Sequence, residues 1–291
     1  MKRKYLLPAL LVTLVGVCPP ILPRALVKSP SKNYLTHQET NPVEPELVSF
    51  PSGDLVLRGY LYKPEGAGPF PAIIWNHGSE KLPGQQPELA RYYTKLGFVF
   101  FLPHRHGQGR SPGPYIEELI EKYAAIEKNR TLFQKYVVRL HEEYNLDVVA
   151  AVEWLKGQSF VDQRRMVMSG CSYGGIQTLL TAEKGLGLRA FVPFAPAAKS
   201  WVNTELRKRL LEAVLGAQAP LFLIQAQNDF SLGPSGVLGP MIEQKGPPNQ
   251  ARIYPPYGTT PQEGHWDFAT KEGGIDIWGP DVLAFFQVVI R

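Results

Sequence analysis

Residues 147–175 read DVVAAVEWLKGQSFVDQRRMVMSGCSYGG. Apolar side chains from Val148 to Leu155 recur at the spacing of one helix face. A short strand is expected over 165–168, and it runs into the small-residue turn SGCSYGG, after which residues 176–182 again carry a helical pattern. A helix, a strand, a tight turn and a second helix in this order are typical of a parallel α/β sheet.

The alternation of strands and helices extends over most of the chain. We expect a hairpin from Leu47–Phe50 and Leu55–Tyr62, strands at 72–75, 98–102, 189–193, 220–226 and 252–254, and helices at 87–96, 115–128, 131–156, 201–215 and 282–290. Such alternation predicts an α/β fold, with a mostly parallel central sheet flanked by helices. Ligands of these sheets bind beyond the carboxyl ends of the strands, so functional residues are expected in the loops that follow strands.

The composition is that of a globular protein with a large core. The chain has 291 residues, of which 44% are hydrophobic and 20% charged, which excludes a disordered chain. Two cysteines exclude a disulfide framework and a cysteine-based zinc ribbon. The net charge of +5 arises at one end, because residues 1–28 hold five bases and no acid, and the other 26 bases balance the 26 acids. A neutral body without basic runs argues against nucleic acid as a partner.

The N-terminus is typical of an export signal. Three basic residues precede an apolar run from Tyr5 to Val17, which is shorter than the roughly 20 residues of a membrane-spanning helix. We expect residues 1–28 to be a signal peptide or, in the alternative, an uncleaved N-terminal anchor that tethers the protein to a membrane through residues 5–22. Lipidation at Cys18 is disfavoured, because Val17 is bulkier than the residue expected before such a cysteine.

Two regions follow this signal. Residues 29–45 are polar, contain proline and lack periodicity, which indicates a linker. Residues 46–291 hold the expected strands and helices and are interpreted as one folded domain. The protein is therefore expected to be exported, which includes periplasmic, extracellular and membrane-tethered locations.

Residues 170–174 (GCSYG) match the pattern G-x-S-x-G between a strand and a helix, which is the context that gives the pattern its meaning. The glycines let the backbone pass close to its neighbours, and the turn presents the Ser172 hydroxyl at the top of the sheet. The backbone N–H of Tyr173 and the positive end of the helix dipole then face a developing oxyanion. We expect Ser172 to be a nucleophile; the alternative is a glycine-rich turn with an incidental serine.

A serine nucleophile needs a base, and the base needs a carboxylate that orients it. Asp229 follows the buried run 221–226, and His265 follows the strand expected at 252–254. Serine first, then acid, then histidine is one of the chain orders in which catalytic triads occur. The alternative acids are Asp267 and Asp276, and the rival histidines are His37, His77, His104, His106 and His141.

The loop after the strand at 72–75 supplies the candidate oxyanion hole. Gly78 lets a backbone N–H turn toward the nucleophile. We therefore expect the amides of Ser79 and Tyr173 to donate to the oxyanion.

The loop at 104–114 carries further polar groups. His104 and His106 lack a third ligand at a suitable spacing, so no metal site is predicted. Arg105 and Arg110 are interpreted either as contacts for an anionic substrate or as solvated charges.

Several segments together resemble the α/β-hydrolase superfamily, more narrowly its dienelactone hydrolase-like branch, close to prolyl oligopeptidase-type catalytic domains. The matching segments are LRGYLYKPEG (57–66), PAIIWNHGS (71–79), HGQGRS (106–111), the stretch at 147–175, QAQNDF (225–230) and GHWDF (264–268). The resemblance implies the α/β-hydrolase fold for residues 46–290. It also implies Ser172 as nucleophile, Asp229 as acid and His265 as base.

Cys171 marks a departure from that branch. Dienelactone hydrolases use a cysteine as nucleophile, whereas this chain has Ser172 at that position and Cys171 one residue before it. A frame shifted to Cys171 would put Ser169 and Tyr173 where the glycines belong, so we expect Cys171 to be a small packing residue.

The leading hypothesis is an exported serine hydrolase that cleaves small-molecule carboxylic esters through a Ser-His-Asp triad and an acyl-enzyme, without a cofactor. The stretch from Gly109 to about Asn145 is longer than a crossover helix requires and is a candidate for a small helical cap, as is 201–215. The alternatives are a serine peptidase of the oligopeptidase type and a non-catalytic hydrolase-like binding protein.

Overall fold

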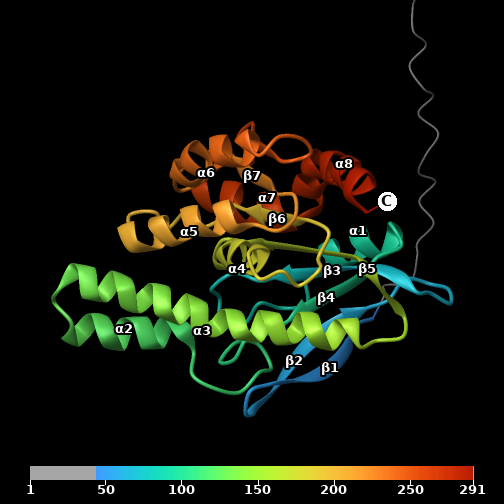
Figure 1. Cartoon of the computed structure of the whole chain (residues 1–291), viewed down its shortest axis with the longest axis horizontal. Coiled ribbons are helices and arrows are strands. Elements are labelled where there is room, and N and C mark those ends of the chain that lie inside the picture. Colours follow the sequence, from blue (N-terminus) through green and yellow to red (C-terminus); the bar gives the residue numbers. More distant parts are fainter. Residues whose placement is uncertain (1–43, 291) are drawn as a thin grey trace, which may run out of the picture. The chain divides into compact units, whose positions relative to one another are not determined.

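Eight strands form one sheet within residues 44–290, the part of the chain that the computed structural model describes (Figure 1). The strands are β1 (Glu46–Ser52), β2 (Leu55–Tyr62), β3 (Phe70–Asn76), β4 (Val99–Pro103), β5 (Val161–Cys171), β6 (Phe191–Phe194), β7 (Phe222–Ala226) and β8 (Gln250–Tyr254). Their spatial order is β1-β2-β4-β3-β5-β6-β7-β8. β2 pairs antiparallel with β1 and β4, and the other neighbours pair parallel. The expected mostly parallel α/β sheet is confirmed.

Helices connect the strands. They are α1 (Pro87–Lys95), α2 (Ile116–Ile126), α3 (Arg130–Lys156), α4 (Tyr173–Ala182), α5 (Thr204–Gly216), α6 (Gly233–Gln244), the π-helical turn η1 (Glu263–Asp267), α7 (Phe268–Thr270) and α8 (Glu272–Val289). The signal or anchor expected at 1–28 lies outside the described residues, as does most of the linker expected at 29–45.

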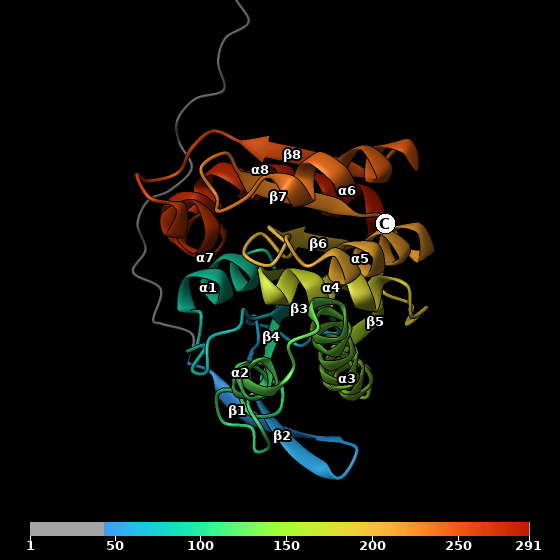
Figure 2. The ribbon, with the colours of Figure 1, turned by 90° about the vertical axis from the view of Figure 1, so that its left-hand side faces the viewer.

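The sheet separates two apolar cores. Successive side chains of a strand point to opposite faces, so Ile74 of β3 packs in one core and Ile73 in the other. The core that contains Ile74 also holds apolar side chains of α3, α4, α5 and α6, and the other core holds those of α1 and α8. Figure 2 shows these two sets of helices on opposite sides of the sheet. Burial on both faces explains why the central strands are continuous apolar runs.

Two helices differ from the expectations because their sequences contain helix breakers. Helix α6 was not expected, since GPSGVLGPMIEQ holds three glycines and two prolines. Pro234 lies in its first turn, where a missing N–H costs little. Helix α8 begins ten residues before the expected 282, although Pro280 lies inside it. Trp278 is fully buried there and donates its indole N–H to the Phe268 carbonyl at 2.8 Å, so tertiary packing overrides local propensity.

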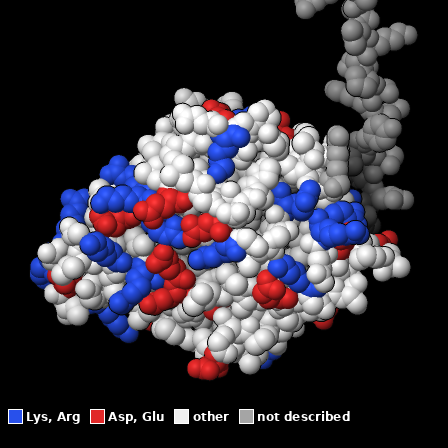
Figure 3. Space-filling view, viewed as in Figure 1, with Lys and Arg blue, Asp and Glu red and all other residues white. Residues whose placement is uncertain are grey.

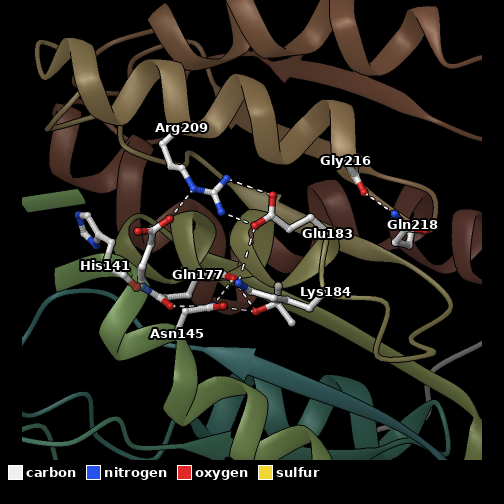
Figure 4. A network of polar contacts seen from close by, with 10 residues as sticks. His141, Asn145, Gln177, Glu183, Lys184, Arg209, Gly216 and Gln218 are labelled. Carbon is white, nitrogen blue, oxygen red and sulfur yellow. Dashed lines mark hydrogen bonds and ion pairs between the residues drawn. The ribbon is translucent and has the colours of Figure 1, made fainter. Parts of the chain in front are cut away.

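A polar network fastens α3, α4 and α5 together on one side of the sheet (Figure 4). The guanidinium of Arg209 in α5 donates to Glu142 of α3 at 2.7 Å and to both carboxylate oxygens of Glu183, which directly follows α4. Asn145 of α3 donates to the Gln177 side chain of α4 at 2.9 Å. These bonds fix α4, the helix that follows the candidate nucleophile, against its two neighbours.

The visible surface carries charges of both signs. Lysines and arginines lie among aspartates and glutamates on the face seen in Figure 3. Such a mixture gives this face no extended field of one sign. Among the helices of residues 44–290, none combines the length and apolarity that crossing a membrane requires.

The Arg209 network leads to a stability prediction. Arg209→Met leaves two carboxylates without their shared cation, one of them only 21% exposed, and is expected to lower the free energy of unfolding by about 1–2 kcal/mol. The measurement is urea denaturation followed by circular dichroism. Lys208→Met is the control, because the Lys208 side chain is 67% exposed, against 14% for Arg209, and its i,i+3 pair with Glu205 should contribute less than about 0.5 kcal/mol. Equal losses in both variants would contradict a role for Arg209 in joining the helices.

Candidate active site

Ser172 lies at the turn between β5 and α4, with φ 60° and ψ −117°. A non-glycine residue at positive φ is strained, and such strain persists where the surroundings over-determine the backbone. Here the Ser172 N–H donates to the Phe194 carbonyl at 3.0 Å, which ties the turn to β6. The expected strand–turn–helix context of the GCSYG motif is therefore present, and the strand is longer than the expected 165–168.

The glycines of the motif allow β3 to approach the turn. A Cβ added at Gly174 would overlap the carbonyl oxygen of Asn76, and one at Gly170 would lie 2.6 Å from the same oxygen. Any larger residue at either position would push the turn away from the end of β3. The small residues are thus required by packing, as the sequence indicates.

His265 and Asp229 form a buried pair. His265 Nδ1 lies 2.8 Å from Asp229 Oδ1, and their side chains are 3% and 0% exposed. Asp229 follows β7, as expected, and its Oδ1 also accepts the N–H of Phe230 at 2.6 Å. Its Oδ2 accepts from the Gln225 amide at 2.9 Å, so both carboxylate oxygens are held in place. An imidazole whose Nδ1 is bonded to a carboxylate has a fixed tautomer and ring orientation.

The segment that carries His265 differs from the expectation. The sequence predicts a loop there, whereas residues 263–267 form the π-helical turn η1. Gly264 is needed in it, because an added Cβ would overlap the Asn228 side chain. The Cys171 thiol donates to the His265 carbonyl at 3.3 Å, so the residue just before Ser172 contacts the histidine segment directly. π-Helical turns occur frequently at functional sites.

Ser172 and His265 line one cavity of about 340 Å³, together with Ser79. The Nε2 atom of His265 is buried and has no hydrogen-bond partner in the described structure. It is the nitrogen left free by the Asp229 bond, and therefore the one able to take a proton. The structure thus brings the three expected residues of the triad to one place, with the serine and histidine on a shared cavity.

The expected oxyanion residues flank the same serine. Tyr173 is the first residue of α4, where helix N–H groups lack intrahelical partners. Ser79 follows β3 and lines the cavity with Ser172. Tyr115 of the following segment donates its hydroxyl to the Ser79 carbonyl, which restrains the loop from the side of α2.

Arg105 has a role that the sequence analysis did not foresee. Its side chain is buried, and one guanidinium nitrogen donates to the carbonyls of His77 and Gly78 at 2.8 and 2.7 Å. Its guanidinium also lies 4.2 Å from the ring centroid of Tyr173. Arg105 therefore joins the two candidate oxyanion segments, and its burial contradicts the interpretation as a solvated charge. Nothing local in HRHGQGR indicates this, because its partners lie on other loops.

The rival histidines of the β3 and β4 loops are occupied elsewhere. His77 Nδ1 lies 2.9 Å from the Arg105 guanidinium, and burial followed by that charge lowers its pKa well below the usual range. The same two causes lower the pKa of His104 to about 4. His106 lies 2.6 Å from Asp147 rather than from the acid of the candidate triad.

The structure also bears on the remaining candidate residues. Cys171 is fully buried, and burial raises the pKa of its thiol, as suits a packing residue. Asp276, one alternative acid, is exposed on α8, and His37 lies outside the described residues. Within the described residues no group of three or more His, Cys, Asp or Glu side chains is arranged to hold a metal ion.

A second cavity of about 480 Å³ is also lined by Ser172. Its walls are largely apolar and come from α2 (Ile120) and the first half of α3 (Phe133 and Val137). These two helices form the cap expected from the long stretch after Gly109. The segment at 202–203 also lines the cavity, whereas α5 itself does not.

Known proteins share these features to different extents. The model of the prolyl oligopeptidase family matches residues 141–209. Polyketide transferase grgF of Penicillium sp is 26% identical over 213 residues, which cover 68% of this chain and 64% of that protein. The chain therefore spans less than two thirds of this curated relative.

Solved structures match most of the chain. The acylaminoacyl peptidase of Pyrococcus horikoshii has a TM-score of 0.63 at 17% identity, over 86% of this chain and 42% of the peptidase. The Pyrococcus furiosus esterase Pf2001 has a TM-score of 0.61 at 14% identity, over 86% and 94%. A Klebsiella pneumoniae protein named as a dienelactone hydrolase has a TM-score of 0.57 at 19% identity, over 85% and 99%.

The chain has the α/β-hydrolase fold. The expected resemblance to the α/β-hydrolase superfamily and its dienelactone hydrolase-like branch is confirmed. The matched family region contains the GCSYG turn and α4 together with the second half of α3. These similarities support a hydrolase.

The turn itself yields a prediction about stability. Gly174→Ala forces a methyl group onto the Asn76 carbonyl and is expected to destabilise the fold by about 1–3 kcal/mol. The measurement is the midpoint of chemical denaturation. Gly236→Ala in α6 is the matched control, because its Cβ meets no atom within 4 Å and alanine favours a helix. A Gly174→Ala protein as stable as Gly236→Ala would contradict the proposed packing of the turn.

Proposed function

We propose that this protein is an exported serine hydrolase that cleaves carboxylic esters of small molecules, with Ser172 as nucleophile, His265 as base and Asp229 as acid. The observation that carries the proposal is a serine on a strained turn that shares a cavity with a buried imidazole, itself bonded to a carboxylate. Residues 1–28 act in this proposal as the signal peptide or membrane anchor. The chemistry needs no cofactor.

The reaction begins with proton transfer. His265 Nε2 takes the proton of the Ser172 hydroxyl as the serine oxygen forms a bond to the ester carbonyl carbon. Negative charge moves to the carbonyl oxygen, where the N–H groups of Ser79 and Tyr173 stabilise it. The bond from carbon to the alcohol oxygen then breaks, and the imidazolium gives its proton to the departing alcohol. An acyl-enzyme remains.

Water completes the cycle. His265 takes a proton from the water molecule that attacks the acyl carbon, and the bond to Ser172 breaks as the serine regains a proton. Asp229 holds the imidazole ring in one orientation throughout and stabilises its cation. The two bonds from Gln225 and Phe230 keep the carboxylate itself from rotating.

The lining of the cavity beside Ser172 favours esters over peptides. The apolar cavity beside Ser172 suits a compact acyl or alcohol group rather than an extended polar backbone. Peptide hydrolysis and binding without catalysis are the competing functions.

A serine-directed probe separates these functions. A fluorophosphonate is expected to label the wild-type protein and to leave Ser172→Ala unlabelled, as read by gel fluorescence and intact mass. Cys171→Ala is the control and should still label, since the thiol is buried and bonded to the His265 carbonyl. Absence of labelling in the wild type would favour the binding protein. A panel of aryl esters and peptide amides then distinguishes esterase from peptidase.

The acid has a separate test. Asp229→Asn should reduce kcat for a reactive aryl ester by about 10³- to 10⁴-fold, because the amide holds the imidazole in the wrong tautomer. KM should change little, since Asp229 is fully buried and forms no part of the cavity walls. Asp276→Asn on the exposed face of α8 is the control and should keep wild-type kinetics. A loss of activity in Asp276→Asn with retention in Asp229→Asn would refute this assignment of the acid.

A further inference from the structure

His141 stands in the wall of the apolar cavity. It lies on α3, its side chain is 6% exposed, and it lines the same cavity as Ser172. Its ring centroid is 4.9 Å from that of Tyr173, the residue directly after Ser172. The imidazole therefore packs against the residue that follows the candidate nucleophile. It forms part of the wall of a cavity that a substrate would occupy.

One ring nitrogen of His141, Nδ1, is buried and has no hydrogen-bond partner within the described residues. The backbone carbonyl of His141, by contrast, accepts from the Gln177 amide at 3.0 Å. Figure 4 shows the His141 ring directed away from the network that includes Gln177 and Asn145. Burial, followed by the charge of Arg105, lowers the pKa of His141 to about 3.

A neutral imidazole offers one donor and one acceptor nitrogen, so it can bind a hydroxyl group in either sense. Three polar neighbours in the cavity wall are engaged, whereas the buried hydroxyl of Tyr173 lacks a hydrogen-bond partner, as His141 Nδ1 does, within the described residues. Asn203 accepts from the Leu206 N–H at 2.9 Å, and Lys199 donates to Gln262 at 3.3 Å. Glu117 is hydrogen-bonded to Ser79. His141 is therefore a wall residue that carries an unpaired nitrogen, and a ligand in this cavity lies beside it.

The rest of the wall is apolar. It includes Ile120, Phe133, Val137, Ile176, Ala197 and Val202. The volume of about 480 Å³ lies within the range of small-molecule pockets. Such a wall accepts a hydrocarbon ring or chain by burial of apolar surface, and one hydrogen-bonding position within it selects for a matching polar atom.

We propose that this cavity binds the apolar part of the ester substrate and that this part carries a hydroxyl group, as in a hydroxyphenyl substituent, which hydrogen-bonds to His141. The proposal rests on the proposed function at Ser172 and names its substrate class. His141 acts as a binding residue and takes no part in the proton transfers. A substrate without the hydroxyl leaves the imidazole unpaired and is bound less well.

Two substrate pairs test this. One is methyl phenylpropanoate and its para-hydroxy derivative, which places the hydroxyl on the acyl side; the other is phenylethyl acetate and its para-hydroxy derivative, which places it on the alcohol side. Wild type should prefer the hydroxylated member of one pair by about 3- to 10-fold in kcat/KM, the range of one neutral hydrogen bond. His141→Phe keeps a planar ring, removes both nitrogens and should abolish that preference.

The controls separate the inference from the proposed function. Loss of all ester hydrolysis and of fluorophosphonate labelling in the wild type would remove the proposed function itself. Hydrolysis without any preference in either pair overturns the role of His141 alone, and this measurement needs no variant. Glu117→Gln should retain the preference; a preference lost there and kept in His141→Phe assigns the hydroxyl to Glu117 and overturns the inference. His141→Asn, which restores a hydrogen-bonding amide, should recover part of the preference lost in His141→Phe.

Discussion

The site depends on the close approach of the end of β3 to the turn after β5. The Asn76 carbonyl oxygen occupies the space that a side chain at Gly170 or Gly174 would need. This contact holds the turn against the end of β3, and the loop that carries Ser79 begins directly after Asn76. One backbone contact therefore sets the distance between the nucleophile and one of its candidate oxyanion donors. Ser172 has a strained backbone in this turn, and the hydrogen bond from its N–H to the Phe194 carbonyl helps to hold that conformation.

Two further contacts join the remaining parts of the site to this turn. Arg105 binds the carbonyls of His77 and Gly78 and packs over the Tyr173 ring, so it fixes the second segment relative to the first. Cys171 contacts the His265 carbonyl and positions η1 against the strand that ends at the nucleophile. The Ser79 loop and the His265 segment are thus tied to residues immediately around Ser172, and Asp229 is joined to them through its bond to His265.

The sequence predicts those features that depend on neighbours along the chain. The GCSYG turn between strand and helix is local, and the alternation of strands and helices follows from apolar patterning, so both were predicted. Helix α6 and the first half of α8 were not, because burial of residues such as Trp278 outweighs their glycines and prolines. The role of Arg105 and the π-helical turn at His265 depend on contacts between distant segments, which no local pattern records.

Chemistry and selectivity reside on separate elements in this arrangement. The candidate nucleophile, acid and base follow β5, β7 and β8, and the packing of the sheet leaves them little freedom. The apolar cavity, by contrast, is walled by α2 and the first half of α3, which extend past the sheet (Figure 1). Changes in these helices can alter the shape of the cavity without moving the turn at Ser172. His141 lies where the two parts meet, with its carbonyl bonded to α4 and its ring in the cavity wall, so it is placed to couple substrate choice to the rigid catalytic frame.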